Sequence, residues 1–181
     1  MTVTAGGQVE GRAVVVLGLM GSGKTTIASA VAEALGRPLR DSDPDLRRTH
    51  GLDTTALAER DGTQALHDWE ADHVVAAVAE RPPVVVAAAA STIEVERCRE
   101  AMDRAFVLWL DAPPEVLAQR FTSGAYRPAF GKEPLALLRE QDPVRRPLFS
   151  QVADVVLDAA APLERVRAAA LRAVGVTEGA R

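Results

Sequence analysis

Between Gly18 and Thr25 the chain has the residue types and the spacing that bind a polyphosphate. The segment reads Gly-Leu-Met-Gly-Ser-Gly-Lys-Thr and matches the pattern G-x-x-x-x-G-K-[ST]. Its glycines allow backbone turns that point successive N–H groups at a phosphate. Lys24 would add a positive charge, and Thr25 would offer a hydroxyl to Mg²⁺. The residues expected to contact the nucleotide are Gly21, Ser22, Gly23, Lys24, Thr25 and Thr26.

This motif binds phosphate only when the loop leads into the N-terminus of a helix, where unpaired N–H groups face an anion. Residues 13–17 form an apolar run typical of a buried strand, and residues 26–35 read as a helix. The order strand, glycine loop, helix therefore favours nucleotide binding. The alternative is a glycine-rich turn that binds nothing.

Two acids, Asp41 and Asp43, follow the first helix. We predict a short strand that ends in residues 41–44, on which alternation would place both carboxylates on one face. In an open α/β sheet, ligands lie beyond the carboxyl ends of the strands, so both acids would face the terminal phosphate. One would hold Mg²⁺ through water, and the other would accept a hydrogen bond from an incoming hydroxyl. The alternative is that one of them only caps a helix beginning near Pro44.

Other polar groups lie on a predicted helix over residues 63–81 and on a predicted loop. His67, near the start of this helix, would either contact a ligand or remain solvated on the surface. Residues 121–132 are rich in turn formers and cations, as is typical of a mobile lid whose arginines contact a triphosphate only when closed. A solvated basic loop is the alternative for this segment.

The remaining chain alternates apolar strands with helices. Continuous apolar runs at residues 84–90 and 105–111 predict buried parallel strands, and residues 153–158 predict the last strand. Ser91 is expected to cap the next helix, residues 135–149 to be helical apart from Pro143, and residues 163–174 to form the closing helix. Together these patterns predict an α/β fold with three layers, in which helices flank a parallel sheet of five strands.

Composition limits the organisation and the partners. A chain of 181 residues with 48% hydrophobic content fits a single domain, with tails at residues 1–11 and 175–181. Its net charge of −4, with both signs mixed, predicts small-molecule partners rather than nucleic acid. The single cysteine, Cys98, excludes an internal disulfide. We expect a cytoplasmic protein, without a signal peptide or membrane span, that is a monomer or weak dimer.

From about Val14 to Val174 the chain resembles the shikimate kinases, small kinases with a P-loop. The resemblance rests on an ordered set of motifs: Gly-Leu-Met-Gly-Ser-Gly-Lys-Thr at 18–25, Asp-Ser-Asp at 41–43, Glu70, Arg127-Pro128, and Arg145-x-Pro-Leu-Phe at 145–149. It implies the fold of P-loop kinases, with ATP and Mg²⁺ as the nucleotide and the metal.

The resemblance also implies roles for individual residues on the nucleotide side. Asp41 corresponds to the metal-associated aspartate, alongside Thr25. Arg120 and Arg127 correspond to lid arginines that contact the phosphates or base of ATP. The loop 158–162, which ends at Pro162, corresponds to the segment that packs against adenine.

On the acceptor side, Asp43 corresponds to the aspartate that binds the substrate hydroxyls, and Arg145 to an arginine that clamps a substrate carboxylate. Two departures alter this part. His67 stands where the family has a second carboxylate-binding arginine. Alanines replace a run of three glycines that would bring backbone N–H groups close to the substrate, and they are Ala88, Ala89 and Ala90.

The function predicted from these features is transfer of the γ-phosphoryl of MgATP to an alcohol of a small hydroxylated acceptor. Lys24, Asp43 and Arg127 would be catalytic, through positioning and charge neutralisation. Shikimate is the leading named acceptor, and a related cyclitol, sugar acid or biosynthetic intermediate is the alternative. A non-catalytic nucleotide-binding regulator and a nucleoside monophosphate kinase are two further hypotheses.

Overall fold

The computed structural model describes residues 9–122 and 133–176 of the chain. In that part, five strands form one sheet in the order β2-β3-β1-β4-β5, and all neighbouring strands are parallel. This confirms the predicted parallel sheet of five strands. The strands are β1 Val14–Leu17, β2 Leu39–Asp41, β3 Val85–Ala87, β4 Phe106–Asp111 and β5 Val155–Asp158.

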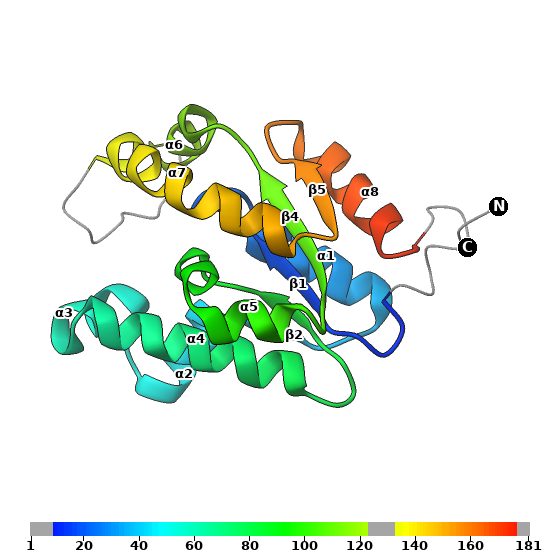
Figure 1. Ribbon diagram of the computed structural model, residues 1–181, viewed down its shortest axis with the longest axis horizontal. Helices are drawn as coiled ribbons and strands as arrows, with labels where there is room; N and C mark the ends of the chain where they lie inside the picture. The colour runs from blue at the N-terminus through cyan, green and yellow to red at the C-terminus, as the bar shows by residue number, and fades with distance from the viewer. Residues whose placement is uncertain (1–8, 123–132, 177–181) are drawn as a thin grey trace.

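Helices cover both faces of the sheet and complete the three predicted layers (Figure 1). On one face α1 packs beside α8, and on the other α4, α5 and α7 lie across the strands. The helices are α1 Lys24–Leu35, α2 Ser42–His50, α3 Thr54–Asp61, α4 Thr63–Ala79, the 3₁₀ helix η2 Ala90–Glu94, α5 Glu96–Met102, α6 Pro114–Thr122, α7 Pro134–Val152 and α8 Leu163–Ala173.

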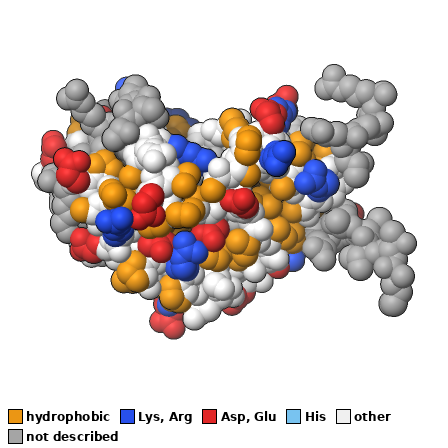
Figure 2. Space-filling model, turned by 90° about the horizontal axis from the view of Figure 1, so that it is seen from above, with side chains coloured by type: hydrophobic (Ala, Val, Ile, Leu, Met, Phe, Trp, Pro, Cys, Tyr) orange, Lys and Arg blue, Asp and Glu red, His pale blue; other side chains and the backbone are white. Residues whose placement is uncertain are grey.

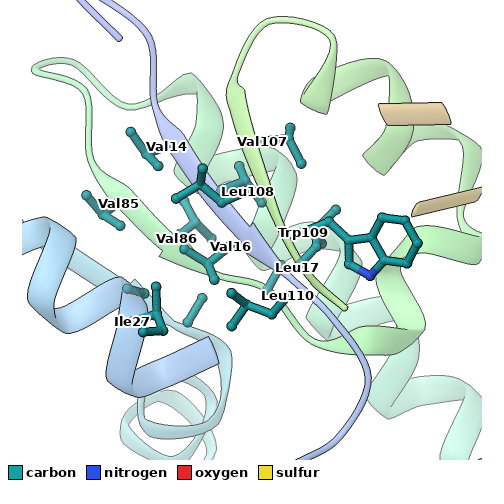
Figure 3. Close-up of a cluster of buried hydrophobic side chains, with 14 of the residues drawn as sticks. Val14, Val16, Leu17, Ile27, Val85, Val86, Val107, Leu108, Trp109 and Leu110 are labelled. Carbon is teal, nitrogen blue, oxygen red and sulfur yellow. The ribbon is translucent and has the colours of Figure 1, made fainter. Parts of the chain in front are cut away.

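The core lies on the three central strands and the helices that cover them. Every residue of β1 is fully buried, because helices cover both faces of a parallel sheet. Ile27 of α1 faces buried side chains of β1 and β3, as Figure 3 shows. A smaller apolar cluster joins α2, α3 and α4 through Leu46, Leu57 and Leu66. The second cluster holds α2 beside the long helix α4.

The strand and helix boundaries correct the predicted position of the two acids. The strand β2 ends at Asp41, and α2 begins one residue later, so Asp43 lies in the first helical turn rather than in an extended strand. The Asp41 carboxylate accepts a hydrogen bond of 3.4 Å from the backbone N–H of Asp43 and caps α2. The two acids are therefore close because of a helix cap and not because of strand alternation.

Three further predictions were wrong. The strand β3 ends at Ala87, and the chain continues as the 3₁₀ helix η2, in which Ser91 donates to the Glu70 carboxylate instead of capping a helix. The helix α7 also continues through Pro143 and Pro147. Buried side chains on both sides of Pro143 anchor α7 to the core, which outweighs the local cost of a proline in a helix.

The surface carries both signs of charge. On the face in Figure 2, acidic and basic side chains are interspersed with apolar ones, in keeping with the net charge of −4. Within residues 9–122 and 133–176, no helix is long and apolar enough to cross a membrane.

Substitution of two valines of the sheet, one buried and one exposed, compares how much each position contributes to the free energy of unfolding. Val16 in β1 has no exposed surface, whereas Val156 in the edge strand β5 is 53% exposed. We expect Val16→Ala to lower the free energy of unfolding by about 2 kcal/mol, and Val156→Ala by less than about 1 kcal/mol. Urea denaturation followed by circular dichroism measures both values. Equal losses would contradict the assignment of the core.

Candidate active site

A pocket of about 390 Å³ opens at the carboxyl ends of β1, β2 and β3. The pocket brings together most of the residues that were predicted from the sequence to form the site. The predicted site residues that line it are Gly21, Gly23, Lys24, Thr25, Thr26, Asp41, Asp43, His67, Ala88, Ala89, Arg120 and Arg145. Segments separated by more than a hundred residues therefore meet in one cavity.

The glycine loop wraps the start of α1 in the geometry of a phosphate cradle. Gly18 allows close packing, since a Cβ there would lie 2.6 Å from Ser22 Oγ and 2.7 Å from the carbonyl oxygen of Leu110. Gly23 has a φ of +92° and is the N-cap of α1, and no side chain caps this helix. Its first N–H groups therefore lack a side-chain acceptor, which fits an anionic ligand.

Lys24 opens α1 on the wall of the pocket, where its amino group donates a hydrogen bond of 3.2 Å to the carbonyl oxygen of Leu19. Desolvation lowers the pKa of Lys24 to about 8, while Asp43 and Asp41 oppose this shift. A polyphosphate beside the amino group would favour its charged form. The position and the environment of Lys24 thus suit a ligand with several negative charges.

Thr25 and Asp41 connect the glycine loop to the end of β2. The Thr25 hydroxyl donates a hydrogen bond of 2.6 Å to an Asp41 carboxylate oxygen, and Asp41 is 7% exposed. Both oxygens are of the kind that Mg²⁺ prefers. The described residues contain no cluster of three or more His, Cys, Asp or Glu side chains that could hold a metal alone. Mg²⁺ usually takes few protein ligands and shares phosphate oxygens, so Thr25 and Asp41 are the residues that would hold it beside a polyphosphate.

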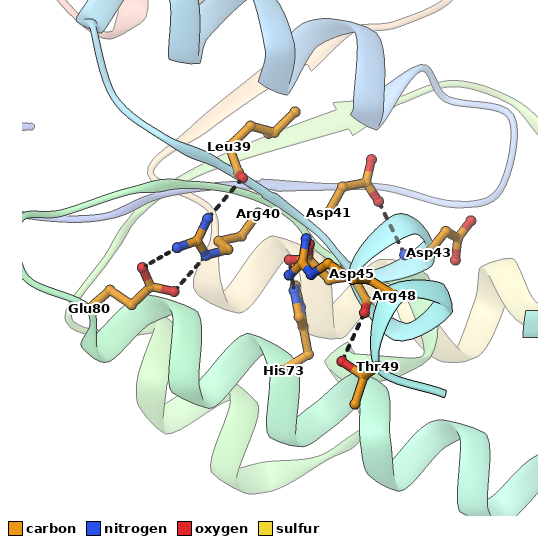
Figure 4. A network of polar contacts seen from close by, with 9 residues as sticks. All are labelled: Leu39, Arg40, Asp41, Asp43, Asp45, Arg48, Thr49, His73 and Glu80. Carbon is orange, nitrogen blue, oxygen red and sulfur yellow. Dashed lines mark hydrogen bonds and ion pairs between the residues drawn. The ribbon is translucent and has the colours of Figure 1, made fainter. Parts of the chain in front are cut away.

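Polar contacts hold α2, and with it Asp43, against α4 (Figure 4). His73 of α4 lies 2.8 Å from the Asp45 carboxylate, and Arg40 of β2 forms two hydrogen bonds with Glu80, of 2.7 and 2.9 Å. Asp43 lies at the pocket, where burial and the nearby Asp41 carboxylate raise its pKa. The first turn of α2 is thereby fixed at the pocket.

Across the pocket from the glycine loop, α4 contributes Glu70 and His67. Burial raises the pKa of Glu70 to about 7, although a hydrogen bond from Ser91 partly opposes the shift. Burial and the Arg145 charge lower the pKa of His67, which favours its neutral imidazole, while Glu94 and Asp68 oppose this shift. Both residues can exchange hydrogen bonds with a polar ligand.

Arg145 of α7 lies on the same side of the pocket and is 7% exposed. Its Nε donates a hydrogen bond of 2.6 Å to the Glu94 carboxylate at the end of η2, and its Nη1 donates one of 2.9 Å to Gln141. The guanidinium is therefore already paired with a carboxylate of the protein.

Among the described residues, two predicted site residues, Ser22 and Pro162, do not line the pocket. The Ser22 side chain is buried behind the loop without a hydrogen-bond partner among the described residues. Pro162 is the N-cap of α8, although Arg120 donates a hydrogen bond of 2.6 Å to Ala159 in the same loop. Residues 121 and 122 of the predicted lid end α6, and its remainder, including Arg127, lies outside the described residues.

The sequence analysis did not nominate Glu94, Gln141 or Glu70 as site residues. Gln141 and Arg145 are four residues apart, so they lie on the same face of α7. The predicted break at Pro143 hid this relation. Glu94 has no comparable local signal, because 51 residues separate it from Arg145.

The strand order, the glycine loop at α1 and the adjacent Thr25–Asp41 pair define this protein as a P-loop kinase. The protein-family model described as shikimate kinase matches residues 20–174. The chain therefore belongs to the shikimate kinase family, whose members are phosphotransferases that use ATP and act on an alcohol.

Individual relatives agree with this assignment. A shikimate kinase of Symbiobacterium thermophilum is 36% identical over 146 residues, which cover 78% of this chain and 83% of that protein. The structure of a shikimate kinase from Acinetobacter baumannii in complex with shikimate has a TM-score of 0.80 and 26% identity, and covers 93% of each chain. A gluconokinase structure from Sinorhizobium meliloti 1021 has a TM-score of 0.64 and 25% identity, and covers 91% of each chain.

The raised pKa of Glu70 predicts a pH dependence of stability. The folded protein binds the Glu70 proton more tightly than the unfolded chain, whose carboxyl group has an ordinary pKa of 4.5. The free energy of unfolding should therefore fall as the pH rises from about 4.5 to about 7. In Glu70→Gln, which keeps an acceptor for Ser91, this loss should be smaller by about 2 kcal/mol. Urea titrations at pH 5 and pH 8 measure the difference, and equal losses in both proteins would refute it.

Proposed function

We propose that this protein transfers the γ-phosphoryl group of ATP to a hydroxyl of a small polyhydroxylated molecule, with Mg²⁺ as the cofactor. The observation that carries this proposal is the convergence of Lys24, the Thr25–Asp41 pair and Asp43 in one pocket. Shikimate, the ligand in the Acinetobacter baumannii structure, is the first acceptor to test. A sugar acid or cyclitol is the second, because His67 and the Ala88–Ala90 segment depart from the family pattern.

The proposed reaction breaks the bond between the γ-phosphorus and the β–γ bridging oxygen. A new bond forms between that phosphorus and the acceptor oxygen, the hydroxyl proton leaves toward Asp43 or solvent, and ADP departs. The glycine loop and Lys24 would bind the β- and γ-phosphates, and Asp43 would orient the attacking hydroxyl. Catalysis then depends on positioning and on neutralising charge rather than on a covalent intermediate with the protein.

Further roles follow for residues around the pocket. Thr25 and Asp41 would hold Mg²⁺, which supplies positive charge to the phosphate oxygens. Arg120 and Pro162 would contribute to the nucleotide side, near the loop that Arg120 already contacts through Ala159. Arg127 would be a catalytic cation. His67, Ala88, Ala89 and Arg145 would line the acceptor side.

Loss of the Lys24 ammonium group tests the proposed reaction directly. Purified protein with MgATP should release ADP in the presence of shikimate or of another polyol from a panel of cyclitols and sugar acids. We expect Lys24→Ala to lower kcat/KM at least about 100-fold, because a preorganised charge at the transferring group is lost. Arg172→Ala, on the exposed side of α8, removes the same charge and should retain activity. Unchanged ADP release in Lys24→Ala would refute the assignment.

Two conservative substitutions separate the roles of the paired acids. Asp41→Asn removes a metal-associated charge and should raise the Mg²⁺ concentration for half-maximal activity by about 10- to 100-fold. Asp43→Asn removes the group proposed to orient the acceptor, so it should lower kcat with little change in the Mg²⁺ requirement. Magnesium titrations of steady-state rates for both variants measure this division. The reverse pattern would exchange the two assignments.

A further inference from the structure

The pairing of Arg145 with Glu94 has a consequence for the acceptor. The Arg145 side chain is only 8% exposed and lines the pocket, whereas Glu94 is 44% exposed and approaches the guanidinium from η2. Their contact of 2.6 Å is a charge-assisted hydrogen bond, a strong class of polar contact. An acceptor carboxylate that used Arg145 would have to compete with Glu94 or displace it.

The other cations that line the described pocket belong to its nucleotide side. Lys24 lies in the glycine loop, and Arg120 of α6 is bonded to the loop after β5. On the acceptor side, His67 of α4 stands where the family has an arginine, and burial and the Arg145 charge lower its pKa. Within the described residues, this end of the pocket therefore lacks a cation whose charge is not already balanced by a neighbouring carboxylate.

Several acids surround the same space. Asp43 and Glu70 line the pocket, and Glu94 accepts a hydrogen bond from Arg145. A carboxylate on the acceptor would add a negative charge near Glu94 and Asp43, and repulsion between partly buried charges is poorly screened. Neutral groups meet suitable partners, because the Gln141 amide and the His67 imidazole can each donate and accept hydrogen bonds.

We propose that the acceptor is a polyol with an uncharged hydroxyl or amide group, rather than a carboxylate, at the end that faces His67 and Arg145. Glu94 sets this preference as a positioning residue, because its carboxylate balances the charge of the guanidinium that would otherwise attract an anion. This inference rests on the proposed phosphotransfer and specifies its acceptor class.

Binding of matched acceptor pairs tests the preference without requiring turnover. The first pair is shikimate and its analogue in which the carboxylate is reduced to a primary alcohol, and the second is gluconate and glucitol. Calorimetry at pH 7.5 with MgADP present gives the ratio of the two Kd values within each pair. In the wild-type protein the neutral member of at least one pair should bind about 10-fold more tightly or better.

Variants of Glu94 show whether this residue sets the ratio. Glu94→Gln retains an oxygen acceptor for Arg145 but removes the charge, so the ratio should shift toward the carboxylate by about 10- to 100-fold. Glu94→Asp keeps the charge and should retain the wild-type preference. Glu100→Gln, an equal charge change at an exposed site on α5, should leave the ratio unaltered. Circular dichroism verifies that each variant is folded.

The outcomes separate the two proposals. Tighter binding of the carboxylate members by the wild-type protein, an unchanged ratio in Glu94→Gln, or no binding of any of the four compounds would overturn the assigned acceptor class. Binding of a neutral polyol without MgATP-dependent phosphorylation would instead refute the proposed function and leave the recognition of uncharged acceptors standing.

Discussion

The parallel pairing of β1 with β3 and β4 determines where this chain can bind a ligand. Helices bury both faces of the sheet, and all five strands point the same way, so polar segments gather beyond the carboxyl ends of the strands. The glycine loop follows β1, Asp41 ends β2, and the alanines follow β3. Because this arrangement follows from the direction and order of the strands, the site depends on the apolar core that fixes both.

Opposite charges placed in a partly buried pocket alter one another's proton affinity. Desolvation pushes the pKa of Lys24 down and that of Glu70 up, so both groups titrate within about one pH unit of neutrality. Such perturbed groups are typical of functional sites. Each carboxylate also opposes the shift at Lys24, so the removal of one charge changes the protonation of the others. The protonation states of these side chains are therefore coupled.

Local signals in the sequence identified the glycine loop, the helix that follows it and Asp41, which the structure brings to one pocket. The glycine loop and α1 are contiguous, and the carboxylate of Asp41 belongs to a short motif, so spacing alone located them. Prediction failed where contacts between distant segments decide the structure. Pro143 suggested a break, but the buried side chains of α7 keep the helix continuous. The Arg145–Glu94 contact joins residues 51 positions apart, and no periodic pattern marks it.

Different elements form the two ends of the pocket. The glycine loop and α1 form one end, and side chains of α4, η2 and α7 form the other. The phosphate cradle depends on close backbone packing at Gly18, which tolerates no side chain. The proposed acceptor side depends instead on side chains of α4, η2 and α7, which contact one another through the Arg145–Glu94, Arg145–Gln141 and Ser91–Glu70 hydrogen bonds. Glu94 contacts the Arg145 guanidinium and also acts on the charge of His67, and both of these residues lie outside the glycine loop.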